Sequence, residues 1–191
     1  MRITGGMAAG RRLTLHRGLA FRPTTDRIRE ALFNILGPPL GVAFLDLYAG
    51  SGAVGLEALS RGARKAVFVD RDAEAARIIG KNVEAFGFGG SCEMLTMEAG
   101  RGIELLSGRR ERFDILFADP PYGEGWIDDT LRRLGDGSLA AVDGILILQH
   151  SRREVPDEPL PAVFSMTDQR RYGDTVLSFI KFKAEAGERV I

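Results

Sequence analysis

The chain has 191 residues, and its 26 Lys and Arg balance 26 Asp and Glu, so its formal net charge at pH 7 is zero. Hydrophobic residues make up 45% and charged residues 27%, which is typical of a globular protein with a real core and excludes low-complexity disorder. Apolar runs end long before the roughly 18 residues of a membrane span, and no secretory signal is visible. The single cysteine, Cys92, leaves no pair for a disulfide or a zinc site. We therefore expect a cytoplasmic protein without a metal.

The zero net charge hides an uneven distribution. Residues 1–40 contain seven arginines against two acids, which leaves +5 in this part of the chain and −5 in the remaining 151 residues. A basic segment on an acidic body indicates a polyanionic partner that touches one end of the molecule. An arginine-rich proteome would explain the excess of arginine over lysine, but it would not explain the shortage of acids in this segment.

The predicted elements begin with short strands and tight turns in the first 20 residues. A helix then opens at Thr24 and Thr25. Arg27 and Arg29 lie on this helix, away from its apolar side. The apolar residues recur at helical spacing, which predicts one buried stripe of Ile28, Ala31, Leu32, Ile35 and Leu36.

From residue 43 onward, apolar strands alternate with helices. The expected strands are 43–48, 65–70, 92–97, 113–118 and 144–149, and the expected helices are 54–61, 72–86, 102–106 and one that carries Ile127, Leu131 and Leu134. Such alternation predicts a parallel sheet covered by helices on both faces. Two final runs, 162–167 and 175–182, predict an antiparallel hairpin at the sheet edge.

The fold class is therefore α/β. We expect a Rossmann-like class I methyltransferase fold, with a mostly parallel seven-stranded sheet, a C-terminal antiparallel hairpin and a small N-terminal β/helix extension. The expected division is a basic N-terminal extension over residues 1–40 and a methyltransferase domain over residues 41–191.

A glycine-rich loop follows the strand at 43–48. Residues 50–55 fit G-x-G-x-x-G, and Asp70 lies twenty residues after Gly50, at the end of the next strand. The glycines allow a sharp turn and a close approach to a ligand, and the acid can accept hydrogen bonds from a ribose. This pattern alone does not choose between NAD and S-adenosylmethionine. Asp46 favours the latter, because a carboxylate ahead of the glycines suits an ammonium or sulfonium group better than a pyrophosphate.

The sequence Asp119-Pro120-Pro121-Tyr122 follows the strand at 113–118. Ligands of open parallel sheets bind outside the carboxyl ends of the strands, so we expect these residues at the same crevice as the glycine loop. Two prolines fix the backbone and present the Asp119 side chain and the Pro120 carbonyl as acceptors. Two acceptors followed by the ring of Tyr122 suit a planar base with an exocyclic amine. Such a base must leave its stack or come from a loop.

At this point the chain resembles the RsmD family, the bacterial 16S ribosomal RNA guanine-N2 methyltransferases, over nearly its whole length. The most specific part is the block 22–34, and the other matching segments are 10–13, 46–55, 57–63, 68–70, 119–122 and 172–175. The resemblance implies S-adenosylmethionine as donor and a guanine N2 amine in 16S rRNA as acceptor. It also implies RNA binding and rRNA processing within an assembling small subunit, and we expect the protein to be a monomer.

The resemblance also implies which residues form the site. The donor would contact Asp46, Tyr48, Gly50, Ser51, Gly52 and Asp70, with Glu98 near its adenine. Asp119 and Pro120 would hold the acceptor amine, and Tyr122 would stack on the base. The RNA would contact Arg11, Arg12, Arg22, Arg27 and Arg29.

Three other functions stay open at this stage. A DNA adenine-N6 methyltransferase uses the same acceptor geometry, although no separate target-recognition segment is visible. A nicotinamide-dependent oxidoreductase would explain the glycine loop and leave residues 119–122 unexplained. An inactive RNA-binding assembly factor would keep the cofactor pocket as a structural feature only.

Overall fold

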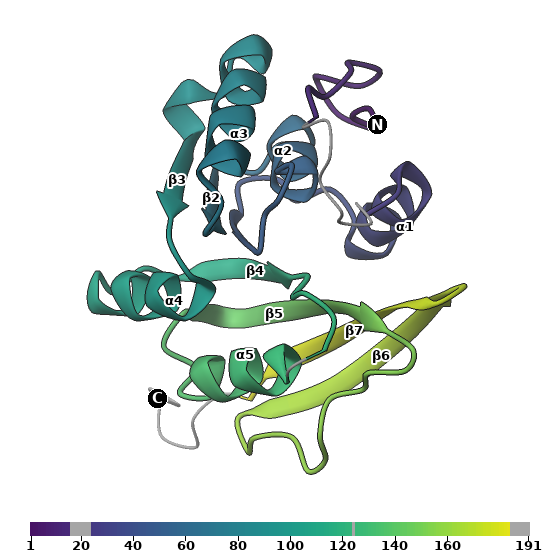
Figure 1. Cartoon of the computed structure of the whole chain (residues 1–191), viewed down its shortest axis with the longest axis vertical. Helices are drawn as coiled ribbons and strands as arrows, with labels where there is room; N and C mark the ends of the chain where they lie inside the picture. Colours follow the sequence, from purple (N-terminus) through teal and green to yellow (C-terminus); the bar gives the residue numbers. More distant parts are fainter. Residues whose placement is uncertain (16–23, 124, 184–191) are drawn as a thin grey trace, which may run out of the picture. The chain divides into compact units, whose positions relative to one another are not determined.

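The computed structural model describes residues 1–15, 24–123 and 125–183. The chain divides into two compact units, residues 1–99 and residues 100–191, whose helices and strands are drawn in Figure 1. Residues 1–40 fall within the first unit. The division of the chain into 1–40 and 41–191 stays a prediction.

The first unit is built on three parallel strands, β1 (Ala43–Leu47), β2 (Lys65–Asp70) and β3 (Cys92–Thr96), in the order β3-β2-β1. Helix α2 (Ala53–Ser60) packs on β1 and β2, and α3 (Ala73–Phe86) packs on β2 and β3. A short turn of 3₁₀ helix, Gly89–Ser91, leads into β3. Every residue of β1 is buried, as expected for a strand of a parallel sheet with covered faces. The parallel register brings the carboxyl ends of these strands to one edge.

Helix α1 (Asp26–Leu36) begins where the sequence predicts, because the Thr25 side chain accepts a hydrogen bond from the N–H of Ile28. Its buried face differs from the predicted apolar stripe. The buried residues are Ile28, Arg29, Leu32 and Phe33, whereas Ile35 is 41% exposed. The prediction that Arg29 lies away from the buried side is therefore wrong.

The predicted strands near the N-terminus are also wrong over residues 1–15. This segment contains one isolated antiparallel bridge, between Arg2 and Arg12. Some of its backbone groups bond to one another, as Ile3 N–H does to Arg11 O, and others donate to side chains of α2 and α3. Its apolar residues Ile3, Ala8 and Leu13 are buried. Residues 1–15 are thus a folded part of the first unit.

The second unit contains β4 (Phe113–Ala118), β5 (Ala140–Ser151), β6 (Phe164–Tyr172) and β7 (Thr175–Phe182), in the order β4-β5-β7-β6. Strands β4 and β5 are parallel, and β7 is antiparallel to both β5 and β6. The helices are α4 (Ala99–Gly108) and α5 (Trp126–Leu134). Helix α4 and strand β5 are longer than predicted.

The predicted fold class is confirmed. The strands of the parallel part alternate with helices, and the last two form the expected antiparallel hairpin. Among the described residues, no helix combines the length and the apolar character needed to cross a bilayer.

Candidate active site

The glycine loop begins with a left-handed residue that is not glycine. Tyr48, directly after β1, has φ 61°, and Gly50 and Gly52 follow with φ 53° and 70°. Two backbone hydrogen bonds hold this path, from Ala49 N–H to Val69 O and from Gly52 N–H to Ala49 O. A left-handed tyrosine is strained, and strain of this kind is concentrated at functional sites.

Asp70 fixes the same loop from the end of β2. Its Oδ2 accepts a hydrogen bond from the N–H of Gly50 at 2.7 Å, and its Oδ1 accepts one from the N–H of Asp72 at 2.9 Å. The carboxylate therefore joins the loop to the start of α3. A carboxylate has about four lone-pair sites, so these two bonds leave acceptor capacity toward ribose hydroxyls. The contact between Asp70 and a donor stays a prediction.

Asp46 lies beneath the loop. It is 2% exposed, and its Oδ2 accepts a hydrogen bond from the N–H of Gly55 at 2.9 Å, in the first turn of α2. The N-terminal turn of a helix leaves N–H groups without helical partners, and a carboxylate there is favourable. Asp46 is thus a buried helix cap that supports the loop. Its predicted effect on a sulfonium or ammonium group is not tested by this geometry.

The loop fits a ribose-bearing donor. A Cβ atom built on Gly50 would meet no atom closer than Tyr48 O at 4.0 Å, and the residues from Tyr48 to Ser51 are partly exposed. An accessible backbone beside a carboxylate at the end of β2 is the arrangement that nucleotide-like ligands require. Among the described residues, no group of three or more His, Cys, Asp or Glu side chains is placed to hold a metal ion.

Two further residues predicted to contact the methyl donor are Ser51, in the glycine loop, and Glu98. The Ser51 hydroxyl donates to Met1 Sδ at 3.8 Å. Glu98, just after β3, is exposed, and its Oε1 lies 3.5 Å from Arg71 Nη1. The role of Glu98 near an adenine stays a prediction.

The residues predicted to hold the acceptor base lie at the carboxyl end of β4 in the second unit. Asp119 is half-buried, Pro120 is buried, and Tyr122 is 51% exposed. The Asp119 carboxylate accepts a hydrogen bond through Oδ2 from Gln149 Nε2 at 2.7 Å. After Tyr122, the N–H of Gly123 donates to Glu154 Oε1 at 2.6 Å. The predicted aspartate is therefore held by a buried side chain of β5, and the loop that follows it is anchored.

The predicted RNA-binding arginines have different environments. Arg12 and Arg27 are exposed. The exposed Arg11 lies over the Phe86 ring, 4.6 Å from its centroid, and donates a hydrogen bond to Ala85 O. Arg22 lies outside the described residues.

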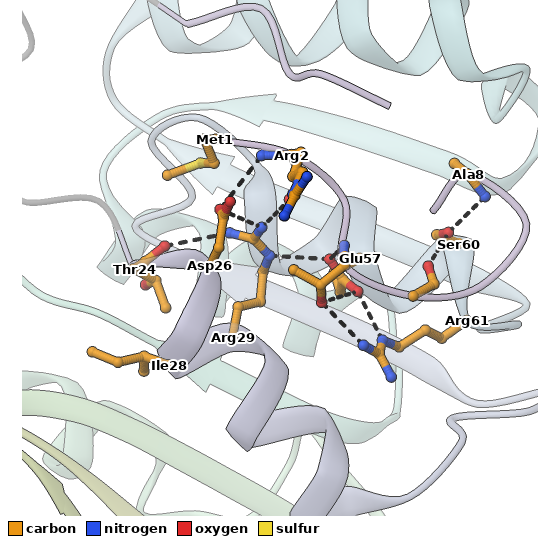
Figure 2. Close-up of polar contacts among 12 residues, drawn as sticks. Met1, Arg2, Ala8, Thr24, Asp26, Ile28, Arg29, Glu57, Ser60 and Arg61 are labelled. Atoms are coloured by element: carbon orange, nitrogen blue, oxygen red, sulfur yellow. Dashed lines mark hydrogen bonds and ion pairs between the residues drawn. The ribbon is translucent and has the colours of Figure 1, made fainter. Parts of the chain in front are cut away.

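Arg29 is 0% exposed, and its guanidinium is bonded to protein groups on all sides. Figure 2 shows it between Asp26, Thr24 and Glu57. Arg29 Nε donates to Glu57 Oε2 at 3.1 Å, Nη2 donates to Asp26 Oδ1 at 3.0 Å, and the remaining bonds go to backbone carbonyls. A guanidinium bonded in this way does not face RNA, so the expectation for Arg29 is corrected to a structural role.

Glu57 on α2 is the acid at the centre of this cluster, and it is also 0% exposed. It accepts hydrogen bonds from the backbone and hydroxyl of Thr4, from Arg29 and from Arg61. Burial by itself raises the pKa of this carboxyl, but the hydrogen bonds from Thr4, Arg61 and Arg29 outweigh burial and hold its pKa below the ordinary value. The cluster joins the N-terminal segment, α1 and α2 (Figure 2).

Sequence reasoning missed the roles of Glu57, Gln149 and Glu154. Two of them had a visible signal. Glu57 is an acid within a helix that is otherwise almost entirely apolar, and Gln149 ends an apolar strand at the edge where ligands bind. Glu154 lies in a polar loop, and nothing in the local sequence distinguishes it.

Comparison with known proteins places the chain in a family. The family described as Conserved hypothetical protein 95 matches residues 1–181. The Ribosomal RNA small subunit methyltransferase D of Escherichia coli (strain K12) is 34% identical over 186 residues, which cover 97% of this chain and 91% of that one. The solved structure of yhhF from Escherichia coli has a TM-score of 0.83 at 29% identity and covers 97% of this chain and 99% of that one.

A more distant structure, SMU.776, was solved in complex with SAH. Its TM-score is 0.69 at 15% identity, with 88% of this chain and 52% of that chain covered, and this likeness concerns the fold alone. The fold is that of the class I methyltransferases, and the Escherichia coli relative is a ribosomal RNA methyltransferase. More narrowly, the chain belongs to the Conserved hypothetical protein 95 family, and the resemblance to the RsmD family is confirmed.

Proposed function

We propose that this protein transfers a methyl group from S-adenosylmethionine to the exocyclic N2 amine of a guanine in 16S rRNA. We further propose that it acts as a monomer on an assembling small subunit, and therefore in the cytoplasm, where these subunits form. The Ribosomal RNA small subunit methyltransferase D of Escherichia coli, which matches 97% of this chain, supports rRNA as the substrate. The oriented carboxylate of Asp119 is the observation that carries the acceptor chemistry.

The residues of the first unit would hold the donor. Asp70, already fixed by Gly50 and Asp72, would accept hydrogen bonds from the ribose hydroxyls. The backbone from Tyr48 to Gly52 would approach the donor closely, supported from below by Asp46. When bound, the donor supplies a methyl group on a positively charged sulfur, which is already activated toward nucleophiles.

The residues of the second unit would hold the base. Asp119 and the Pro120 carbonyl would accept hydrogen bonds from the two N–H groups of the guanine amine. Tyr122 would stack on the guanine ring. An aromatic amine is a poor nucleophile, because its lone pair is delocalised into the ring. Holding both hydrogens would favour a pyramidal nitrogen, whose lone pair would then be available to accept the methyl group. Asp119 would also stabilise the positive charge that develops on the nitrogen and would accept the proton that the nitrogen loses.

The test is transfer of a radiolabelled methyl group from S-adenosylmethionine to three acceptors: small ribosomal subunits, naked 16S rRNA and DNA. We expect label in the ribosomal acceptors and none in DNA, followed by identification of the labelled nucleoside. Asp119→Ala is the matched control for background label.

Each alternative gives a different result in this assay. Label in N6-methyladenosine of DNA would replace the proposal by an adenine methyltransferase. Absence of transfer together with tight NAD binding would indicate an oxidoreductase. RNA binding without any transfer would indicate an assembly factor.

A further inference from the structure

Two side chains from the carboxyl end of β5 and the turn after it contact the loop of residues 119–123, here called the acceptor loop. Gln149 Nε2 donates to Asp119 Oδ2 at 2.7 Å. Glu154 Oε1 accepts a hydrogen bond from the N–H of Gly123 at 2.6 Å. These contacts lie at the two ends of the acceptor loop, so the loop is fastened on both sides of Pro120 and Tyr122.

The strand register brings Gln149 to Asp119. Strands β4 and β5 are parallel neighbours (Figure 1). Their pairing sets Ala118 opposite Leu148. Asp119 follows Ala118 and Gln149 follows Leu148, so the parallel register brings these two residues next to each other. On its other side, β5 is paired with β7, where Gln149 lies opposite Leu177. Gln149 therefore lies on a strand with a hydrogen-bonded neighbour on either side.

The chemistry of Gln149 suits this position. The residue is 2% exposed, and a buried amide is costly unless its hydrogen-bonding groups are paired. Its NH₂ group can donate to a carboxylate, whereas an ionised glutamate of nearly the same shape could not. The bond to Oδ2 restrains rotation of the Asp119 carboxylate and so favours one direction in which it accepts hydrogen bonds.

Glu154 fixes the other end of the acceptor loop. Its own backbone is held by a hydrogen bond from its N–H to Ser151 O at 3.1 Å, in the turn after β5. Gly123 has φ 83°, a conformation that allows the loop to turn sharply after Tyr122. The carboxylate of Glu154 thus fixes the position of the backbone directly after Tyr122, the residue predicted to stack on the base.

We propose that Gln149 and Glu154 are positioning residues for methyl transfer, with Gln149 orienting the Asp119 carboxylate and Glu154 placing Tyr122. This inference rests on the proposed function of the acceptor loop. Gln149 acts through the group that holds the amine, so its loss lowers kcat. Glu154 acts through the group that stacks on the base, so its loss raises KM for the RNA.

The first experiment measures steady-state methyl transfer to small ribosomal subunits by the whole protein. Gln149→Ala lowers kcat roughly 10- to 100-fold, because a small misplacement of a reacting group has effects of this size. The donor Kd, measured by calorimetry, stays within about twofold of the wild-type value. Gln169→Ala is the matched control, since Gln169 donates to Ser178 Oγ at 3.0 Å in the same unit and does not contact the acceptor loop. It leaves kcat unchanged.

A second variant separates positioning from mere packing. Gln149→Glu places a second carboxyl group beside that of Asp119, and two adjacent carboxyl groups share one proton at low pH. The introduced carboxyl then donates to Asp119 and restores activity. At higher pH both groups ionise and repel, so kcat falls at least tenfold as pH rises from 6 to 9, a fall that the wild type does not show.

Two titratable groups follow Gln149 in the chain, His150 on β5 and Glu154 in the turn after it. His150 Nε2 lies 2.8 Å from Ser178 Oγ, and Glu154 is bonded to Gly123. Both are present in the wild type and in Gln149→Glu, so they cannot produce a pH dependence that only the variant shows. Thermal melting of the variant across the same pH range identifies any part of the loss that is due to unfolding.

Glu154 is tested with two variants. Glu154→Ala raises KM for the RNA about tenfold, while Glu154→Gln, which keeps a carbonyl acceptor for Gly123, restores most of the affinity. Equal kcat in Gln149→Ala and the wild type, or a Gln149→Glu profile parallel to that of the wild type, would overturn the role of Gln149. If the wild type itself transfers no methyl group, the proposed function fails instead, so the two failures are distinguishable.

Discussion

A carboxylate that holds an amine in place needs a fixed orientation, because hydrogen bonds weaken steeply when their geometry is poor. Asp119 has this orientation through Gln149 Nε2, at 2.7 Å. At the predicted site of the methyl donor, two backbone N–H groups orient the Asp70 carboxylate. The residue types at these positions could be predicted from sequence. Their hydrogen-bond partners could not, because Gln149 follows Asp119 by thirty positions and is brought to it only by the pairing of β4 with β5.

Replacement of Asp119 by alanine is expected to lower kcat by at least a hundredfold, because one acceptor for the amine is lost. The affinity for S-adenosylmethionine stays within about twofold of the wild-type value. Single-turnover kinetics and calorimetry measure the two quantities separately. An equal loss of donor affinity would mean that Asp119 serves the donor and not the base.

Gly55 provides a packing prediction at the same scale. A Cβ atom at Gly55 would lie 2.4 Å from Phe68 Cε1, while Asp46 Oδ2 would be at 3.1 Å. Gly55→Ala should therefore destabilise the protein by about 1–3 kcal/mol, because the added methyl group overlaps the Phe68 ring. It should also weaken binding of the methyl donor, because it displaces Asp46, which supports the glycine loop. Chemical denaturation measures the first effect.

Gly80 is the matched control, because it lies within α3 and a Cβ atom there would meet no atom within 4 Å. Gly80→Ala should stabilise the protein by about 0.5–1 kcal/mol. If both variants lost the same stability, the close packing of Gly55 against Phe68 would not be the cause.

At the scale of elements, the N-terminal segment, α1 and α2 are held together by the buried pair Arg29 and Glu57 (Figure 2). The sequence predicted the ends of β2, β4 and β7 correctly, because their apolar runs are bounded by turns or charges. It failed for the N-terminal strands, because some of their backbone groups bond to side chains more than fifty residues away, such as Glu57 and Ser60. Local patterns cannot show such partners, and they cannot show that Arg29 is buried.

Glu57→Gln should destabilise the protein strongly at pH 7, by about 3–5 kcal/mol, because it removes one partner of a buried ion pair. The pKa of Glu57 is below its usual 4.5, so the unfolded chain takes up the proton first as the pH falls. The stabilisation by Glu57 is therefore complete above pH 4.5 and is lost as the pH decreases further.

The difference in unfolding free energy between the wild type and Glu57→Gln should shrink below this pH. Urea denaturation from pH 7 to pH 3 measures it. A difference that stays constant over this range would contradict the lowered pKa.

At the scale of the whole molecule, the distribution of charge carries more information than its sum. The net charge is zero, but residues 1–40 carry +5. Part of this positive charge is internal, because Arg29 is buried, while Arg12 and Arg27 are exposed in the same unit as the glycine loop. The polyanionic partner predicted from this segment stays a prediction, and the structure identifies which of its described arginines face solvent.

Charge reversal at Arg12 and Arg27 is expected to weaken RNA binding and to reduce its salt dependence. Each lost phosphate contact lowers the slope of log K against log salt by about 0.7 to 0.9. Filter binding at several salt concentrations measures the slope. Arg132→Glu on α5 is the control, since Arg132 is an exposed arginine outside the basic segment and should leave the slope unchanged. An unaltered slope in the Arg12 and Arg27 variants would remove the basic segment from the RNA interface.

The central claim is that the acceptor is the N2 amine of a guanine in 16S rRNA. Mass spectrometry of nucleosides, after reaction of the purified protein with small subunits and S-adenosylmethionine, tests it most directly. We predict N2-methylguanosine approaching one per 16S rRNA with the wild-type protein and none with Asp119→Ala. A methyl group found on adenine, on cytosine or at another position of guanine would contradict the claim.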